Sequence, residues 1–460
     1  MSIQPETLEF LTQLLGPDRV STRQADLEAH SQDESFHEPH PPEVVVWPQS
    51  AQEISAILKH ANEKRIPVTP WSGGSSLEGN PIPVKGGILL SVFKMNEVLE
   101  IREQDLQVVV QPGIVCDELN KRLARYGLFF PPQPGSSDVA TIGGMVANNS
   151  SGMGSVRYGA TKDYVLQLEM VLPTGEIIRL GRPVFKSSSG YDLIRLIVGS
   201  EGTLGVVTEV TLKLRVRPEL AAAVAVFPTM DAAAQAIYAI NRYGPMPAAL
   251  ELMDPTIVRI SNEYTQSKLQ EAPTLVMEFH GVPAGVEQEV ELIEETCRDA
   301  GCLSFSRGFS QADREQLWRA RKKAHEAVKQ LNTDSELETG DIVVPISRYA
   351  EAVGMAYKLA QELGARIATY GHAGDGNLHV EMLSLKGDAH QKHVAHEFNR
   401  QFVHWVLSVR GSCTGEHGIG IGKREFMAIE HGASLDVMRL IKRTLDPNGI
   451  MNPGKMFPDV

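Results

Sequence analysis

The sequence lacks most of the features that mark secreted, membrane-spanning or disulfide-stabilised proteins. Its 4 cysteines in 460 residues are scattered and form no CxxC pair; they are Cys116, Cys297, Cys302 and Cys413. No apolar run approaches the roughly 18–20 residues of a membrane helix. The first residues contain neither the basic and apolar stretches of a signal peptide nor the arginines of a transit peptide. We therefore expect a reduced, cytoplasmic protein.

Positive charge is also in short supply. The chain has 44 Lys and Arg against 57 Asp and Glu, a net charge of −13, and no block of basic residues. Nucleic acid and anionic membrane surfaces are therefore poor partners, although a local basic pocket can still bind a small anion. The 42% hydrophobic and 22% charged residues are typical of a soluble globular protein, and the length predicts two or three domains.

The common nucleotide-binding fingerprints are missing. The first predicted strand–helix unit has no GxGxxG, and the P-loop-like pair Gly422-Lys423 lacks the first glycine and the Ser or Thr of that motif. Instead, four Gly/Ser clusters occupy the first 210 residues: 71–76, 134–137, 142–154 and 199–205. Consecutive backbone N–H groups in such turns bind anions, and the absent Cβ lets a diphosphate approach. Four clusters together indicate a large phosphate-bearing cofactor.

The composition changes after Pro218, and this divides the chain. Apolar periodicity predicts helices over 51–64, 230–243 and 312–332. From 219 to 411, helices and strands alternate in the manner of an α+β domain built on an antiparallel sheet. We predict domains at 1–218 and 219–411, with 412–460 as a C-terminal segment that returns to the first domain.

Two glycine-rich segments near the C-terminus supply three histidines and a carboxylate. Asp375-Gly376 is a strong signal for a two-residue hairpin turn, and such a turn would place His372 opposite His379. The two imidazoles could then share a metal ion, to which Glu416 adds a carboxylate while leaving positions open. His417 would lie beside this set as a base for proton abstraction. The alternative is that these are ordinary hairpin and loop histidines.

Arg321 lies on the apolar face of its predicted helix. It shares the spacing of Leu317, Ala324, Val328 and Leu331, so its guanidinium should point inward. A buried guanidinium must be paired, because an unpaired buried charge costs several kcal/mol. Its partner is either the carboxylate of a substrate or an internal acid, and the residues alone do not distinguish the two.

These segments together resemble the FAD-linked oxidases with the vanillyl-alcohol-oxidase or PCMH-type flavin fold. Within them the chain resembles the group that comprises D-lactate dehydrogenase, the D component of glycolate oxidase and D-2-hydroxyglutarate dehydrogenase. The resemblance rests on segments 371–379, 414–420, 189–193 with 199–205, and 446–455. It implies an α+β fold: a two-subdomain PCMH-type FAD-binding domain and an antiparallel-sheet cap domain for substrate.

The resemblance also implies roles for individual residues. His372, His379 and Glu416 would hold a divalent metal, Zn or Mn, with His417 as the base and Arg321 on the substrate carboxylate. The FAD diphosphate would bind Trp71, Ser72, Gly73, Gly74, Ser75 and Ser76. The rest of the flavin would be lined by Pro134, Gly135, Ser136, Ser137, Thr141, Ile142, Gly143, Gly144, Asn148, Gly152, Gly154, Ser155, Glu201, Gly202, Val206, Val207 and Asn452.

Three positions depart from patterns within this family. Ser76 is not a histidine that could carry a covalent flavin, so FAD is expected to be non-covalent. Thr339 and Glu381 stand where relatives acting on 2-hydroxyglutarate would have Lys and Asn for a second carboxylate. A short D-2-hydroxy acid, best D-lactate, is therefore the expected substrate.

Several alternatives follow from the same residues. A glycolate-oxidising subunit of a multi-subunit oxidase and a D-2-hydroxyglutarate dehydrogenase belong to the same class. A metallohydrolase and a non-catalytic FAD-binding scaffold belong to other classes. The electron acceptor would be a quinone, an electron-transfer flavoprotein or a partner subunit, and nothing in the sequence argues against a homodimer.

Overall fold

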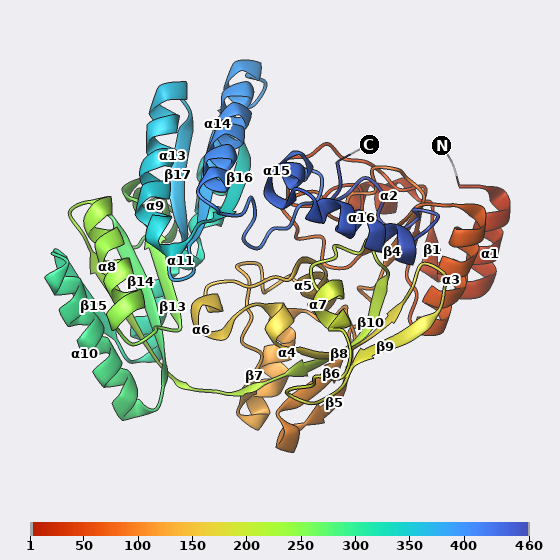
Figure 1. Ribbon diagram of the computed structural model, residues 1–460, viewed down its shortest axis with the longest axis horizontal. Coiled ribbons are helices and arrows are strands. Elements are labelled where there is room, and N and C mark those ends of the chain that lie inside the picture. Colours follow the sequence, from red (N-terminus) through yellow and green to blue (C-terminus); the bar gives the residue numbers. More distant parts are fainter. Residues whose placement is uncertain (1–2, 459–460) are drawn as a thin grey trace. The chain divides into compact units, whose positions relative to one another are not determined.

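The computed structural model describes residues 3–458, which form two compact units. The first unit contains the chain through Ser151, Ala160–Arg217, and the chain from Glu416 onward. The second unit contains Pro218–Gly415 together with the short segment Gly152–Gly159. Figure 1 shows the helices and strands of both.

The first unit contains two main sheets. A four-stranded sheet has the order β1-β2-β4-β3, with β2, β4 and β3 parallel and β1 antiparallel to β2. A five-stranded antiparallel sheet has the order β5-β6-β10-β8-β9, and β7 and β11 form a separate pair. The strands are β1 Val20–Ser21, β2 Val44–Val46, β3 Val68–Trp71, β4 Ile88–Ser91, β5 Val98–Arg102, β6 Gln107–Val110, β7 Leu128–Phe129, β8 Val165–Val171, β9 Ile177–Gly181, β10 Val206–Lys213 and β11 Arg215–Val216.

Short helices lie before, between and after these strands. They are α1 Pro5–Leu15, α2 Gln24–Ala29, α3 Ala51–Lys64, α4 Cys116–Leu123, α5 Ile142–Asn148, α7 Leu193–Ile197, α15 Met427–His431 and α16 Ser434–Leu445. Helix α3 begins where the Ser50 hydroxyl accepts the N–H of Glu53, and it ends where Arg65 turns left-handed with φ 55°. The predicted bounds of this helix, 51–64, are confirmed.

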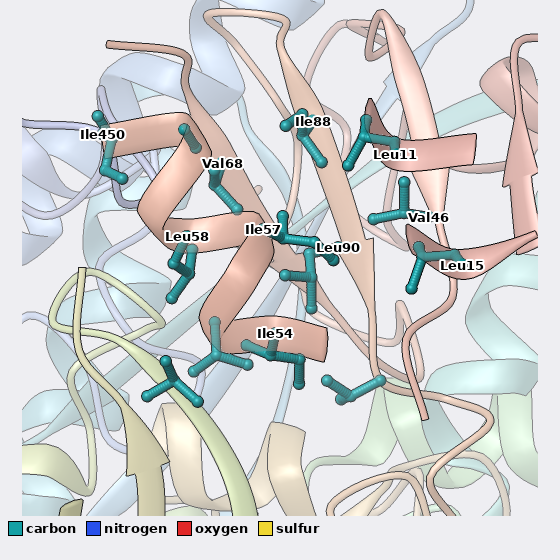
Figure 2. Close-up of a cluster of buried hydrophobic side chains, with 14 of the residues drawn as sticks. Leu11, Leu15, Val46, Ile54, Ile57, Leu58, Val68, Ile88, Leu90 and Ile450 are labelled. Atoms are coloured by element: carbon teal, nitrogen blue, oxygen red, sulfur yellow. The ribbon is translucent and has the colours of Figure 1, made fainter. Parts of the chain in front are cut away.

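Helix α3 carries the core of the first unit. Its apolar residues Ile54, Ile57 and Leu58 pack in one cluster with residues of the parallel strands and of α1, as Figure 2 shows. Ile450, from the C-terminal part of the chain, joins the same cluster. The last residues of the first unit are therefore held to its first hundred by apolar burial, which is the main driving force for this packing.

The second unit is built on one antiparallel sheet of seven strands in the order β15-β12-β14-β13-β17-β18-β16. The strands are β12 Glu219–Val226, β13 Ala249–Met253, β14 Thr274–Gly281, β15 Ser304–Gly308, β16 Ser335–Val343, β17 Arg366–His372 and β18 Asn377–Leu385. Neighbours in this sheet are often far apart in sequence; β13 pairs with β17, for example.

Helices cover both faces of this sheet. Helices α9 (Pro255–Thr265), α11 (Gln311–Lys322) and α12 (Ala324–Leu331) bury Ala222, Val224 and Tyr370 on one face. On the other face, Asn399 of α14 (Ala389–Ser408) lies close to Gly340. The remaining helices are α6 Ser155–Tyr158, α8 Met230–Tyr243, α10 Pro283–Asp299 and α13 Tyr349–Leu363.

The long helix predicted over 312–332 is wrong in one respect. The helix breaks at Lys323, whose φ of −103° and ψ of 11° leave the helical region, and α12 then packs against α9. The helix predicted over 230–243 is confirmed as α8, and the α+β class is also confirmed.

Candidate active site

One face of the seven-stranded sheet carries a row of polar side chains. The strand register places Glu251 opposite His372, and His379 opposite Asp341. Directly opposed residues lie on the same sheet face. Because β13, β17, β18 and β16 are consecutive in the sheet, these four side chains form one continuous polar row.

The register of the β17–β18 hairpin differs from the prediction. His379 pairs with Tyr370, not with His372, because the loop between the strands has four residues, 373–376, and not two. His372 and His379 are therefore diagonal neighbours, at a spacing that long and aromatic side chains still bridge. The predicted pairing was wrong by two residues, yet the two rings do meet.

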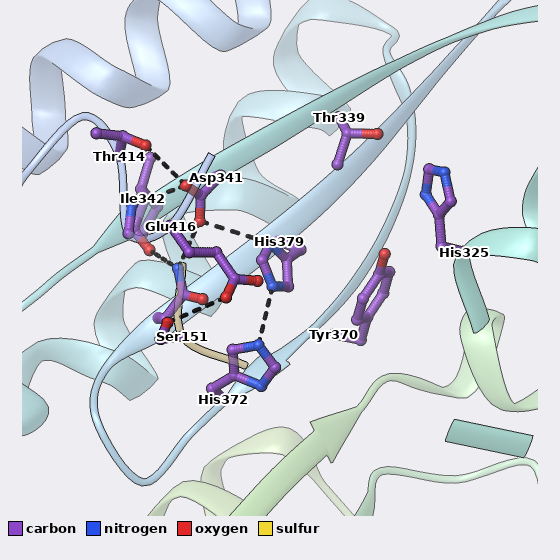
Figure 3. Close-up of polar contacts among 12 residues, drawn as sticks. Ser151, His325, Thr339, Asp341, Ile342, Tyr370, His372, His379, Thr414 and Glu416 are labelled. Atoms are coloured by element: carbon purple, nitrogen blue, oxygen red, sulfur yellow. Dashed lines mark hydrogen bonds and ion pairs between the residues drawn. The ribbon is translucent and has the colours of Figure 1, made fainter. Parts of the chain in front are cut away.

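The two imidazoles meet in an arrangement suited to a metal ion. Their Nε2 atoms are 3.5 Å apart, the rings are perpendicular at 89°, and both residues are buried (Figure 3). Two Zn–N bonds of ordinary length at the tetrahedral angle would place the nitrogens about 3.3 Å apart. The observed separation therefore fits two ligands of one ion with little movement.

A carboxylate lies on the far side of each imidazole. His372 Nδ1 is 2.8 Å from Glu251 Oε1, and His379 Nδ1 is 3.6 Å from Asp341 Oδ1. At His372, the carboxylate within hydrogen-bond distance of Nδ1 favours the tautomer that keeps its proton there and leaves the Nε2 lone pair for a metal, whereas the 3.6 Å separation at His379 is longer than a hydrogen bond. This carboxylate–histidine arrangement is typical of metal sites.

Asp341 is itself held in place by the chain. One oxygen accepts the side-chain amide of Asn377 at 2.7 Å, and the other accepts the Thr414 hydroxyl at 2.9 Å and the Gly415 N–H at 2.7 Å. The same carboxylate therefore supports His379 and fixes the segment that leads directly to Glu416.

Arg321 is buried, as predicted, and its partner is an internal acid. Its Nε and Nη2 atoms lie 2.8 and 2.5 Å from Glu251 Oε2, and its guanidinium lies over the Tyr370 ring. Burial pushes the pKa of Glu251 upward, but His372 and Arg321 outweigh it and hold the pKa below its usual value. Of the two alternatives, the structure shows the internal pair with Glu251, and the assignment of Arg321 to a substrate carboxylate stays a prediction.

Glu416 and His417 belong to the first unit. The Ser151 hydroxyl donates to Glu416 at 3.1 Å, and the Asn148 side chain donates to the backbone carbonyl of His417 at 3.2 Å. Both residues are half-buried. The Glu416 side chain and the His417 backbone are therefore anchored to the end of α5 and to the segment that follows it.

The predicted diphosphate loop begins where β3 ends. The Ser72 hydroxyl bonds the Thr141 hydroxyl, which also accepts the Gly144 N–H and caps α5. A Cβ at Gly73 would lie 2.7 Å from the Val139 carbonyl oxygen, so this segment requires glycine. The loop thus exposes bare backbone with a hydroxyl nearby, which fits a diphosphate.

The other predicted flavin-lining residues divide between the units. Most lie in the first unit, whereas Gly152, Gly154 and Ser155 belong to the second, where the Ser155 hydroxyl donates to Asp375. The Glu201 carboxylate is taken up by the N–H groups of Ile419 and Gly420, at 2.7 and 2.8 Å. Its side chain therefore joins segments of the first unit.

Asn452 has a similar joining role, and Val206 is part of the core. The Asn452 amide donates to the carbonyls of Asn80 and Glu201, at 2.9 and 2.8 Å. Val206 packs in the apolar cluster around α3. Because these side chains are engaged within the protein, they could contribute to a cofactor site through their backbone groups and the shape of the surface they form.

Sequence reasoning missed Glu251 and Asp341. Glu251 is the single acid in the otherwise apolar strand Ala249–Met253, and it is fully buried. Asp341 lies two residues after Thr339 on β16, so the two side chains are on the same face of the sheet. An acid inside an apolar strand was the available signal, since such a group is buried only with a partner.

Two family models match the chain. The FAD binding domain matches residues 42–181, and the FAD linked oxidases, C-terminal domain, matches residues 217–456, more than half of the chain. The chain belongs to the FAD-linked oxidases. The resemblance noted from the motifs is thereby confirmed, and so is FAD as the cofactor of this oxidase family.

Two relatives cover most of this FAD-linked oxidase. It is 39% identical over 427 residues to the mitochondrial D-lactate dehydrogenase (cytochrome) of Arabidopsis thaliana, covering 92% of this chain and 75% of that protein. It is 35% identical over 460 residues to the glycolate oxidase subunit GlcD of Bacillus subtilis, covering 99% and 97%.

Solved structures confirm the fold. The p-cresol methylhydroxylase structure with substrate bound has a TM-score of 0.83 at 16% identity and covers 99% of this chain and 96% of its own. The 4-ethylphenol oxidase of Gulosibacter chungangensis has a TM-score of 0.81 at 18% identity, covering 99% and 97%. The PCMH-type fold is thus as expected. Within residues 3–458, no helix has the length and apolar character needed to cross a membrane.

Proposed function

We propose that this FAD-linked oxidase oxidises a short D-2-hydroxy acid, best D-lactate, to the 2-keto acid with the help of a divalent metal. The observation that carries the proposal is the buried pair His372–His379, with Nε2 atoms 3.5 Å apart and a carboxylate behind each ring. In this proposal Glu416 is the third ligand. It follows Gly415, whose N–H is bonded to the carboxylate behind His379.

The chain would contribute positioning and one proton transfer. We assign His417 as the base that takes the hydroxyl proton, because it follows the proposed ligand Glu416 and its backbone is held by Asn148. When bound, a divalent cation would lower the pKa of the hydroxyl it touches, and FAD would accept the hydride from C2. The residues of segment 71–76 and Thr141 would hold the FAD non-covalently.

The surroundings of Glu381 support a short substrate. Its buried carboxylate accepts the hydroxyls of Tyr370 at 2.6 Å and Thr339 at 2.8 Å, and it lies 2.9 Å from His325 Nδ1. Burial raises the pKa of Glu381, but His325 and the hydroxyls outweigh it and lower the pKa overall. Glu381 follows His379 by two residues on the same sheet face, roughly 7 Å along the strand. A buried anion there disfavours a second substrate carboxylate.

The test is anaerobic flavin reduction with the purified protein. We expect a yellow protein that bleaches fastest with D-lactate, more slowly with L-lactate and D-2-hydroxyglutarate, and slowly after its metal is removed by a chelator. A colourless protein, or a flavin that no 2-hydroxy acid bleaches, would overturn the proposal.

A glycolate-oxidising role is the second candidate. It is favoured by the 35% identity to the GlcD subunit, which extends over 99% of this chain and 97% of that protein. Glycolate lacks the methyl group of lactate, so the same assay separates the two. Faster bleaching by glycolate than by D-lactate would favour this second function.

A further inference from the structure

We propose that Cys297 and Cys302 form a site of oxidative modification, at which hydrogen peroxide converts the two thiols into a disulfide. Both residues belong to the second unit, where Cys297 lies in the last turn of α10 and Cys302 follows that helix. In the sequence they are five residues apart and form no CxxC motif. The proposal is independent of the substrate and of the metal of this oxidase.

The end of α10 forms a Schellman motif, in which two backbone hydrogen bonds close the helix. The Cys302 N–H donates to the Cys297 carbonyl at 3.0 Å, and the Gly301 N–H donates to the Arg298 carbonyl at 2.9 Å. Gly301 has a φ of +82°, the left-handed conformation that this motif requires after the last helical turn. The chain therefore reverses sharply and brings Cys302 back to the level of Cys297.

The motif brings the two thiol side chains together. The residues joined by its outer backbone bond frequently make an apolar side-chain contact, and here both residues are cysteines with free thiols. A backbone bond of this kind sets the two Cα atoms roughly 5–6 Å apart, as between hydrogen-bonded residues of neighbouring strands. Disulfides span Cα separations of roughly 4.4–6.8 Å, so the bond can form with little movement of the backbone.

The two thiols differ in their access to solvent. Cys297 is buried, whereas Cys302 is half-buried and can be reached by a molecule as small as peroxide. Burial raises the pKa of both thiols, to about 12 for Cys297. Because the thiolate is the nucleophile, Cys302 is the thiol that reacts first, and the reaction is slow at neutral pH.

The chemistry balances with peroxide as the oxidant. The Cys302 thiolate attacks one peroxide oxygen, the O–O bond breaks, and hydroxide leaves and takes up the thiol proton as water, which gives a sulfenic acid. The Cys297 sulfur then attacks the sulfenic sulfur; the S–S bond forms, the S–O bond breaks, and the Cys297 proton leaves with the hydroxyl group as a second water. Each sulfur loses one electron, and the peroxide gains both.

The disulfide would staple the end of α10 to the edge of the sheet. Leu303, directly after Cys302, donates its N–H to the Val226 carbonyl at 2.7 Å, and β15 follows as the edge strand beside β12. Figure 1 shows α10 and β15 at the same end of the second unit. The staple would therefore restrain an edge strand that only one neighbouring strand holds, and an unrestrained edge can pair with other chains.

The test counts free thiols after FAD-loaded protein is treated with hydrogen peroxide at about pH 8.5, where more thiolate is present. Catalase removes the peroxide, the protein is unfolded, and the free thiols are labelled with N-ethylmaleimide and located by mass spectrometry. The untreated protein should carry 4 labels. The treated protein should keep the labels on Cys116 and Cys413 and yield a peptide that joins Cys297 to Cys302 and lacks two hydrogens. Dithiothreitol should restore all 4 labels.

Cys116→Ala and Cys297→Ala are matched variants, since each removes one buried thiol. Cys116 lies in the first unit, where its Sγ donates to the Pro132 carbonyl at 3.5 Å, and Cys116→Ala should still form the disulfide. Cys297→Ala should stop at a sulfenic acid on Cys302, which dimedone traps in this variant and not in the unmodified protein. If Cys297→Ala does not fold, the half-buried change Cys302→Ala serves instead, and it should leave the label on Cys297 intact.

Two results would overturn the proposal. If all 4 labels remain after a treatment that fully oxidises glutathione in the same solution, the two cysteines act as small packed residues and nothing more. If the label on Cys302 is lost while Cys297 keeps its own, through a sulfinic acid or a disulfide between two copies of the chain, the two sulfurs do not meet.

Discussion

Replacing Glu201 should test whether the loop after His417 is held by one buried carboxylate. This side chain accepts the N–H groups of Ile419 and Gly420 and the side-chain amide of Asn80, at 2.7, 2.8 and 2.6 Å. Glu201→Ala would leave three buried donors without an acceptor. Each such donor costs about 1–3 kcal/mol, so the low end of the sum is about 3 kcal/mol of unfolding free energy.

The expected loss is large enough to measure by thermal and urea unfolding. For a unit of this size, about 3 kcal/mol corresponds to a fall in Tm of roughly 6–12 °C. Glu201→Gln keeps one acceptor oxygen and should lose less than half as much. Glu209→Ala is the matched control: that acid pairs with the half-exposed Arg179, a contact worth under about 1 kcal/mol.

Two further readouts separate anchoring from cofactor binding. If Glu201 is an anchor, replacing it should lower the rate of flavin reduction as well as the free energy of unfolding, because Ile419 and Gly420 lie just after His417 in the chain. If the free energy of unfolding of Glu201→Ala lies within about 1 kcal/mol of that of the unmodified protein, the reasoning from buried donors is refuted. Unchanged stability with weakened FAD affinity would instead assign the residue to the cofactor.

Three other outcomes are expected. His379→Ala should retain FAD but lose metal and slow flavin reduction by orders of magnitude, as flavin content and bound metal would show; full activity without metal would contradict the site. His417→Asn should keep FAD and metal and slow single-turnover reduction about 10²–10⁴-fold, less at high pH where hydroxide can act; an unchanged rate would point to another base. Burial and the nearby Lys455 and Arg424 lower the pKa of His37 to about 4, so the unfolded chain binds its proton first and stability is lost as pH falls from about 6.5 towards 4. Urea unfolding at pH 7 and pH 4 gives the stability lost between the two pH values. In His37→Gln that loss should be smaller by up to about 2 kcal/mol, a figure already reduced for the partial exposure of the side chain. The same loss in His37→Gln and in the unmodified protein would contradict the lowered pKa.

Local signals in the sequence were sufficient for much of the fold. The bounds of α3 follow from the spacing of Ile54, Ile57 and Leu58 between the Ser50 cap and the end at Arg65. The buried side of Arg321 likewise follows from its helical spacing. Both depend on residues within a few turns of each other, where propensity and periodicity carry the information.

The partners of the site residues could not be predicted in the same way. Glu251 and His372 are 121 residues apart, and they meet because β13 lies beside β17 in the sheet. Strand order across such separations depends on the packing of the whole unit. The sequence could therefore indicate that Arg321 needed an acid, but it could not indicate which one.

The error in the hairpin register shows why the predicted histidine pair still formed. Gly376 was interpreted as part of a two-residue turn, but its φ of +86° and the close approach of the Val344 carbonyl require glycine within a longer loop. The resulting shift is two residues, and side chains alternate faces with a period of two. His372 and His379 therefore stayed on one face and became diagonal neighbours. A shift of one residue would have turned one ring to the opposite face, so the histidine pair depends on the parity of the loop as much as on its length.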